Sequence, residues 1–202
     1  VLNLALTADV IVTGSATFRN IVDVENSAES LVGIASSASE GAVTAEQLDV
    51  RPLRRPGEVL ETVPGMVISQ HSGEGKANQY YLRGFNLDHG TDFATTVAGV
   101  PVNTPTGAHA HGYSDISFLI PELVSGVQYK KGPYFADEGD FSAAGAANIN
   151  YVNQLDRPAV SLSAGNDGWR RLFTAASPRV GEGFLLPALE LNHNDGPWVP
   201  PD

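Results

Sequence analysis

Hydrophobic and polar residues alternate along the last third of the chain. In residues 159–164 a larger apolar side chain alternates with alanine or serine, and in residues 185–192 leucines alternate with other residue types. Because successive side chains of a strand point to opposite faces, each stretch predicts a strand with one apolar and one polar face. The turn sequence Gly165–Gly168 leads from the first strand into another, Arg170–Ala176. We expect three antiparallel strands within residues 157–202.

The pattern between residues 43 and 156 instead predicts short strands mixed with short helices. Thr44 and Gln47 have the spacing of a capping box, which opens a short helix. Pro56 suits the first turn of a second helix, which continues through residues 58–63. We therefore expect an α+β domain, a small mixed β-sheet with short helices. Its expected strands are Met66–Ser69, Gln79–Leu82, Phe93–Val97, Val127–Lys130 and Ala147–Val152, and a further short helix is expected at Ile116–Val124.

Acidic residues dominate the beginning of the chain. Residues 1–50 hold seven Asp and Glu residues against Arg19 alone, and residues 26–42 are rich in Ser, Ala and Gly. Such a composition is typical of an extended, partly mobile segment. The sequence therefore divides into an N-terminal extension at 1–42, a folded domain at 43–156 and the start of a second sheet at 157–202.

Charge and composition exclude several classes of protein. The chain has 12 basic and 23 acidic residues, a formal charge of −11, and no basic stripe for nucleic-acid phosphates. It has no cysteine, which excludes disulfides, thiolate metal sites and a cysteine nucleophile. The chain contains no apolar run of about 18 residues, so its sequence predicts no transmembrane helix. Strands of about ten residues can nevertheless cross a membrane as a barrel. Three strands cannot close a barrel, so we expect a longer protein.

Sequence signatures of catalysis are missing. The motifs His-Glu-x-x-His, Gly-x-Ser-x-Gly and Cys-x-x-Cys do not occur. Gly73–Lys76 has a superficial likeness to a phosphate-binding loop, but Gln70 stands where the first glycine belongs and Ala77 where Ser or Thr belongs. We therefore expect no enzyme, no catalytic residue and no cofactor.

A polar, glycine-containing loop around residues 104–112 carries two histidines. His109 and His111 are two residues apart, so in an extended segment they point the same way. Imidazoles with a carboxylate such as Asp115, and with His89 not far off in sequence, suit a transition metal. Contact with an organic ligand and a plain surface loop are the alternatives. The residues alone leave the three interpretations open, and we assign no metal site.

Five motifs follow one another in the middle of the chain. They are Glu58–Met66, which ends in Pro-Gly-Met; Tyr81–Phe85, which contains Arg-Gly-Phe; Val97–Val102, which contains Gly-Val-Pro-Val; Lys130–Pro133; and Ala144–Ile149. In this order they resemble the plug domain of TonB-dependent outer-membrane receptors. The resemblance covers about residues 10–152, and the strands after Arg157 fit the start of the family's 22-stranded barrel.

The sequence departs from the family pattern in three places. Ala98 stands where Asp is usual in the hairpin, and an alanine replaces the second glycine of the Gly-Gly-x-Ile-Asn strand. The family's Tyr-Gly pair after Gly-Pro is missing, and Phe135–Phe141 stands there instead.

The resemblance implies an energised importer in the bacterial outer membrane. In the family a plug fills the barrel lumen, and a short N-terminal strand pairs by β-augmentation with TonB, part of an inner-membrane complex. The partners implied are TonB, outer-membrane lipid and a small-molecule or metal-chelate substrate such as a ferric siderophore. The plug and the N-terminus would face the lumen and the periplasm. The competing interpretations are a soluble plug-like binding or signalling module without transport, and a periplasmic enzyme.

Two sets of residues match positions that serve energy coupling in the family. The β-branched segment that resembles the TonB-contacting box suits strand addition, and an ordinary edge strand is the alternative. Arg83 and Lys131 stand where basic residues of relatives pair with barrel glutamates and hold the plug, and solvated lumen charge is the alternative. Lysine lacks arginine's bidentate geometry, so Lys131 implies a weaker latch. The expected TonB contacts are Val10, Ile11, Val12 and Thr13.

Substrate contact in the family comes from plug apices that face outward. Two candidate apices are residues 70–78 and 103–113, and both are polar and rich in glycine. The second also carries imidazole and phenol side chains. The expected substrate contacts are Asn103, His109, His111 and Tyr113.

Overall fold

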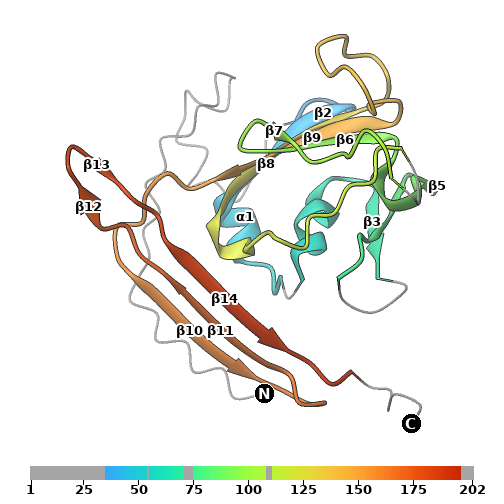
Figure 1. Cartoon of the computed structure of the whole chain (residues 1–202). Helices are drawn as coiled ribbons and strands as arrows, with labels where there is room; N and C mark the ends of the chain where they lie inside the picture. Colours follow the sequence, from blue (N-terminus) through green and yellow to red (C-terminus); the bar gives the residue numbers. More distant parts are fainter. Residues whose placement is uncertain (1–34, 54, 71–74, 108–110, 197–202) are drawn as a thin grey trace. The chain divides into compact units, whose positions relative to one another are not determined.

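The computed structural model describes residues 35–53, 55–70, 75–107 and 111–196 (Figure 1). These residues form two compact units, which divide the sequence between Tyr151 and Val152. The expected TonB contacts at residues 10–13 and the expected substrate contact His109 lie outside the described residues.

A six-stranded mixed sheet is the framework of the larger unit. Its strand order is β1-β2-β8-β9-β6-β7, and all neighbours are antiparallel except β6 and β9, which run parallel. Val43, Val127 and Ile149 lie opposite one another on three neighbouring strands, so they form one buried apolar row. The strands are β1 Ala35–Ser37, β2 Glu40–Thr44, β6 Phe93–Val97, β7 Val100–Pro101, β8 Val124–Lys131 and β9 Gly145–Tyr151.

A second, three-stranded sheet and four short helices complete the larger unit. The sheet has the order β3-β4-β5, with β3 Met66–Ser69, β4 Gln79–Leu82 and β5 Phe85–Asn86. The free edge of β3 is partly covered, because Glu61 Oε1 accepts a hydrogen bond from the Ile68 N–H at 2.9 Å. The helices are α1 Ala45–Asp49 and the 3-10 helices η3 Pro56–Thr62, η4 Asp88–Gly90 and η5 Pro121–Leu123.

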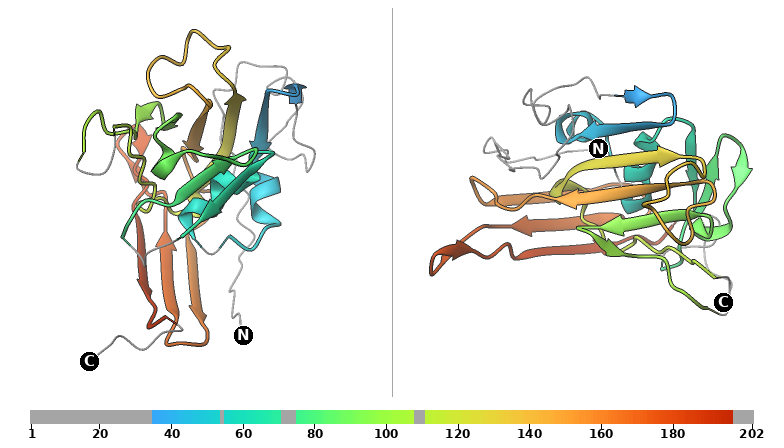
Figure 2. Two further views of the ribbon diagram at one scale, coloured as in Figure 1. Left: turned by 90° about the vertical axis from the view of Figure 1, so that its right-hand side faces the viewer. Right: turned by 90° about the horizontal axis from the view of Figure 1, so that it is seen from above.

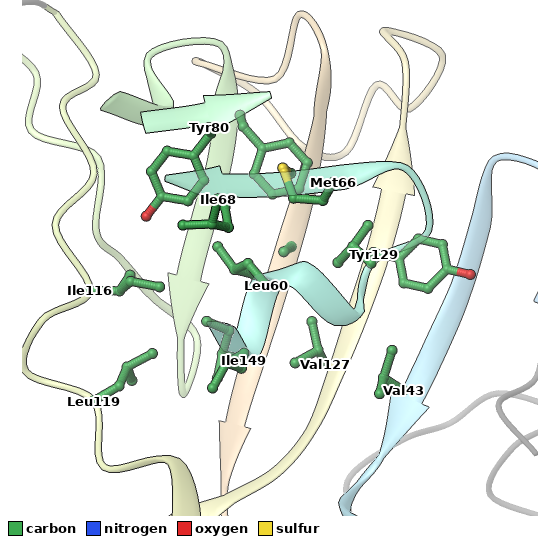
Figure 3. Packing of buried hydrophobic residues seen from close by; sticks show 14 of the residues in the cluster. Val43, Leu60, Met66, Ile68, Tyr80, Ile116, Leu119, Val127, Tyr129 and Ile149 are labelled. Atoms are coloured by element: carbon green, nitrogen blue, oxygen red, sulfur yellow. The ribbon is translucent and has the colours of Figure 1, made fainter. Parts of the chain in front are cut away.

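The core of the larger unit lies where η3 meets the two sheets. Figure 3 shows Leu60 of η3 between Met66 and Ile68 of the small sheet and Val127 and Ile149 of the large one. All five side chains are buried, and Leu60, Val127 and Ile149 have no exposed surface. Burying an aliphatic side chain of this size contributes about 1.5–3 kcal/mol, so η3 joins the sheets through the hydrophobic effect.

Local capping explains why helix α1 begins where the sequence predicts. Thr44 Oγ1 accepts from the Gln47 N–H at 3.2 Å, and Gln47 Oε1 accepts from the Thr44 N–H at 3.0 Å. This reciprocal pair is the expected capping box. The second expected helix also forms, with Pro56 in its first turn, but as a 3-10 helix.

The helix expected at Ile116–Val124 is wrong. Only η5 forms there, and the Asp115 carboxylate accepts from the Ser117 N–H to make a local turn. Pro121 explains the difference, because proline has no N–H to donate and disfavours helical geometry in the residue before it. Ile120 is accordingly extended, with φ −102° and ψ 107°.

The smaller unit is the antiparallel meander that the alternating pattern predicts. Strand β11 (Arg170–Ala175) pairs with β10 (Ala159–Ala164) on one side and β14 (Ala188–His193) on the other (Figure 2). The connection between β11 and β14 carries a small hairpin of its own, β12 Arg179–Val180 with β13 Gly183–Phe184.

The two faces of the meander differ in chemistry. One face carries four exposed aliphatic side chains, each between 49% and 59% exposed: Val160, Leu162, Leu189 and Leu191. On the other face the Arg171 guanidinium donates to both carboxylate oxygens of Glu190, at 3.0 and 2.9 Å, and lies 5.6 Å from the Phe173 ring centroid. No helix within the described ranges is long and apolar enough to span a membrane.

Candidate functional site

The two ends of the loop 103–113 are tied together by backbone hydrogen bonds. Thr104 and Tyr113 form an isolated antiparallel bridge, in which the Thr104 N–H donates to the Tyr113 carbonyl at 2.9 Å. The Gly112 N–H donates to the Thr104 carbonyl at 2.7 Å. Residues 105–111 therefore begin and end at one fixed base.

Asn103 anchors that base to the rest of the unit. Its side chain is 8% exposed, and its Nδ2 donates to the carbonyls of Gly90, Phe93 and Gly112 at 2.9–3.1 Å. Its Oδ1 accepts from the Thr95 N–H at 2.7 Å. A buried amide engaged at both ends supports the backbone around it. The substrate contact expected of Asn103 stays a prediction, and these hydrogen bonds favour a supporting role.

Gly112 is the point at which a third segment packs on the loop base. Its φ is +86°, and a Cβ at this position would lie 2.6 Å from Phe141 Cδ1 and 2.7 Å from the Thr91 carbonyl oxygen. Both the backbone conformation and the lack of space therefore require glycine. Phe141 belongs to the connection between β8 and β9, so this connection contacts the loop 103–113 directly.

Tyr113 and His89 each form a hydrogen bond with the backbone of Ala77, one with its N–H and the other with its carbonyl. The Ala77 N–H donates to the Tyr113 hydroxyl oxygen at 2.7 Å, and His89 Nδ1 lies 2.8 Å from the Ala77 carbonyl oxygen. Because a carbonyl oxygen only accepts, Nδ1 carries the proton. The two rings also contact each other, with centroids 5.5 Å apart. The candidate apices 70–78 and 103–113 are thus joined.

His111 lies on the surface beside the loop base. It is exposed, and its Nδ1 lies 3.1 Å from the Pro105 carbonyl oxygen. Among the residues that the structure describes, no group of three or more His, Cys, Asp and Glu side chains has the arrangement of a metal site. His89, by contrast, is buried at 2% exposure and is occupied with Ala77.

Arg83 and Lys131 form a pair of basic residues next to each other. Burial lowers the pKa of Lys131, and the positive charge of Arg83 lowers it further. Arg83 Nη2 donates to the Ala38 carbonyl and Lys131 Nζ to the Pro64 carbonyl, each at 3.4 Å. Within the described part of the chain no carboxylate forms a salt bridge with either residue. Two neighbouring cations, one only 6% exposed, therefore lack a counter-charge there.

The neighbouring Lys130 differs in this respect. Its Nζ lies 2.6 Å from Asp137 Oδ2 and 2.5 Å from Glu138 Oε1, and it sits over the Phe135 ring. The hydrogen bond from Lys130 holds the pKa of Asp137 below its usual value. Lys130 is thus neutralised within its own hairpin, and Lys131 is not.

The comparison with known families decides what kind of domain this is. The model of the TonB-dependent Receptor Plug Domain matches residues 33–146, which is more than half of the chain. The chain belongs to this family. The larger unit is its plug, and the fold class expected from the sequence, a plug followed by antiparallel barrel strands, is confirmed.

Solved structures share this fold at low sequence identity. The siderophore receptor PirA from Pseudomonas aeruginosa matches with a TM-score of 0.57 at 20% identity, over 80% of this chain and 28% of that one. The copper transporter OprC matches with 0.57 at 19%, over 76% and 23%. The ferric enterobactin receptor PfeA from Pseudomonas aeruginosa, in complex with enterobactin, matches with 0.51 at 18%, over 74% and 24%. The chain thus spans about a quarter of the structures it matches.

Sequence reasoning missed the contacts that join the two candidate apices. His89 and Ala77 lie 12 residues apart, and Tyr113 lies 36 residues from Ala77, so no local spacing relates them. Gly112 offers a weak signal, because a glycine beside aromatic residues marks close approach. The division of the chain at residues 42 and 156 stays a prediction, and β2 crosses the first of these positions.

Proposed function

We propose that the protein is a TonB-dependent outer-membrane receptor that imports a scarce solute by energised movement of its plug. Membership in the TonB-dependent receptor plug family supports the receptor class. The siderophore receptors and the copper transporter with similar folds suggest a metal chelate of the siderophore kind as the substrate. No observation favours the soluble binding or signalling module, or the periplasmic enzyme.

The two-faced meander is the observation that carries this proposal. Strands β10, β11 and β14 follow the plug in the same chain and expose Val160, Leu162, Leu189 and Leu191 on one face. An exposed apolar strand face opposite a polar one is the pattern of barrel strands between lipid and lumen. A soluble module would leave this face in water, which proteins of that kind rarely do.

The loop 103–113 is the proposed contact for the substrate. Its base is fixed by Asn103 and Gly112, so side chains on residues 105–111 would meet a ligand from a defined position. We assign direct contact to His109, His111 and Tyr113, and a supporting role to Asn103. Replacing His109 and His111 by alanine in the full-length protein should weaken chelate binding, and unchanged affinity would remove the loop from the site.

Arg83 and Lys131 are the proposed latch between plug and barrel. Two adjacent cations without a carboxylate partner in the described residues suit barrel carboxylates elsewhere in the full-length protein. Glu190 does not fit this role, because Arg171 already occupies both of its oxygens. Contact of TonB with residues 10–13 rests on sequence resemblance alone.

Growth under iron limitation tests the proposed function. The full-length protein is expressed in an outer-membrane receptor-deficient strain, with and without TonB, and single ferric siderophores are supplied, ferric enterobactin first. We expect at least one chelate to restore growth only when TonB is present. Deleting residues 9–14 should abolish the same growth. Growth that needs the protein but not TonB would contradict the proposal.

A further inference from the structure

Ala77 is held at a position from which a displacement can reach the basic pair. It lies two residues before β4, which runs from Gln79 to Leu82, and Arg83 follows directly. At the far end of this strand the Arg83 N–H donates to the Gly65 carbonyl at 2.7 Å. Strand β4 therefore connects the hydrogen-bonded Ala77 with Arg83, the basic residue that follows it.

The two hydrogen bonds to the Ala77 backbone come from the other candidate apex and from η4. Tyr113 supplies the acceptor for the Ala77 N–H, His89 supplies the donor for the Ala77 carbonyl, and the two rings touch. The Ser114 N–H donates to the His89 carbonyl at 2.9 Å, so the segment 113–114 also holds His89. Tyr80 in β4 adds a further link, because its hydroxyl lies 3.3 Å from the Ser114 carbonyl oxygen.

We propose that Tyr113 and His89 are positioning residues that form a joint, through which the loop 103–113 controls the position of β4 and of Arg83. A solute bound at the loop acts on β4 through the Ala77 backbone, without contacting β4 itself. That a solute arrives at this loop rests on the proposed function above. The joint itself rests only on the contacts of Tyr113, His89 and Ala77.

The left-handed backbone conformation of His89 limits which residues can replace it. Its φ is +63° and ψ +28°, the left-handed region that few residues other than glycine, asparagine, aspartate and histidine adopt readily. Asparagine is therefore a suitable conservative replacement, because it tolerates this conformation and places an amide donor close to the position of Nδ1. Leucine fills similar space and has no donor, and it is also strained in this conformation.

Hydrogen exchange in the full-length protein in detergent tests the joint without any ligand. Tyr113→Phe keeps the ring and removes the hydroxyl that accepts from the Ala77 N–H. We expect the Ala77 amide to exchange on the order of fivefold faster, from the usual size of one hydrogen bond. The amides from Gln79 to Arg83 should also accelerate. Tyr134→Phe, which removes a hydroxyl from a side chain that is 79% exposed, is the matched control and should change neither.

The two histidine replacements test whether a side-chain donor at position 89 restores the contact with Ala77. His89→Leu should accelerate the same amides, and His89→Asn should restore exchange close to that of the unsubstituted protein. Unchanged exchange at Ala77 in Tyr113→Phe would overturn the joint. Faster exchange at Ala77 alone, with β4 and Arg83 unaffected, would overturn the coupling. If His89→Leu does not fold, Tyr113→Phe still decides. The exchange experiment does not depend on transport. If TonB-dependent growth fails, the proposed function is contradicted and the joint is still decided by hydrogen exchange.

Discussion

Single side chains at the loop base decide how firmly the proposed substrate loop is held. Asn103 donates to three carbonyls through its Nδ2 and accepts from one N–H, and it is largely buried. Gly112 lets Phe141 and the Thr91 carbonyl approach closer than a Cβ would permit. Both residues act on the loop from beneath, so their loss should loosen it without removing a ligand-contacting group.

Replacing Asn103 by alanine should destabilise the plug locally. The change removes the acceptor of the Thr95 N–H and the side-chain donor to the Gly90 and Gly112 carbonyls, whereas the Phe93 carbonyl still accepts from Thr95 Oγ1. Each unsatisfied buried group costs about 1–3 kcal/mol. We expect the opening free energy at the Thr95 amide to fall by about 2–4 kcal/mol, measured by native-state hydrogen exchange. The control is Thr106→Ala on the exposed loop, which should leave it unchanged. Equal effects of the two substitutions would refute the supporting role.

Gly112→Ala should be more harmful than an alanine at another left-handed glycine. Gly99 has a φ of +78° and nothing within 4 Å of a Cβ, so Gly99→Ala adds backbone strain alone, about 1–2 kcal/mol. Gly112→Ala adds contact with Phe141 and the Thr91 backbone. We expect a larger loss of opening free energy for Gly112→Ala by hydrogen exchange in β6, and a loss no larger than that of Gly99→Ala would contradict the close packing.

At the scale of elements, local signals predicted more than long-range ones. The capping box at Thr44 and Gln47 and the turn at Gly165–Gly168 act between near neighbours, so the sequence alone locates α1 and the β10–β11 hairpin. The parallel pairing of β6 with β9 depends on residues about 50 positions apart, so the sheet order is not visible in the sequence. The apolar stretch Ile116–Val124 suggested a helix, but Pro121 limits helical structure there to the short η5.

The edge of β3 gives a prediction at this scale. Glu61 on η3 accepts from the Ile68 N–H, which otherwise belongs to the outer edge of the small sheet. Glu61→Ala should remove this bond and lower the opening free energy at Ile68 by about 1.5–3 kcal/mol, the usual range for a charged acceptor. Glu61→Gln keeps an oxygen acceptor and should lose less. Hydrogen exchange at Ile68 measures both, and equal losses would show that the acceptor does not matter.

At the scale of the whole molecule, the plug carries two basic side chains, Arg83 and Lys131, that form no salt bridge among its described residues. Lys130 pairs with Asp137 and Glu138 inside the plug, whereas neither Lys131 nor Arg83 pairs with a carboxylate of the described residues. Lys131 forms no salt bridge among the described residues of the plug, so its replacement breaks no ion pair there. The loss should therefore appear in how the plug is held.

Lys131→Met should weaken the seal of the barrel more than it weakens the plug. We expect cells that express the full-length variant to become more sensitive to vancomycin, because a loosened plug lets a large solute enter the lumen. The control is Lys130→Met, which removes a pair internal to the plug. If Lys130→Met raises vancomycin sensitivity as much as Lys131→Met does, the specific latch role of Lys131 is contradicted.

The most direct measurement is the initial rate of uptake of a radiolabelled ferric siderophore by cells that express the full-length protein. The chelate is the one that restores growth under iron limitation, and matched strains differ only in TonB. We predict saturable uptake in the strain with TonB, and surface binding without uptake in the strain that lacks it. Equal uptake in the two strains would contradict an energised plug.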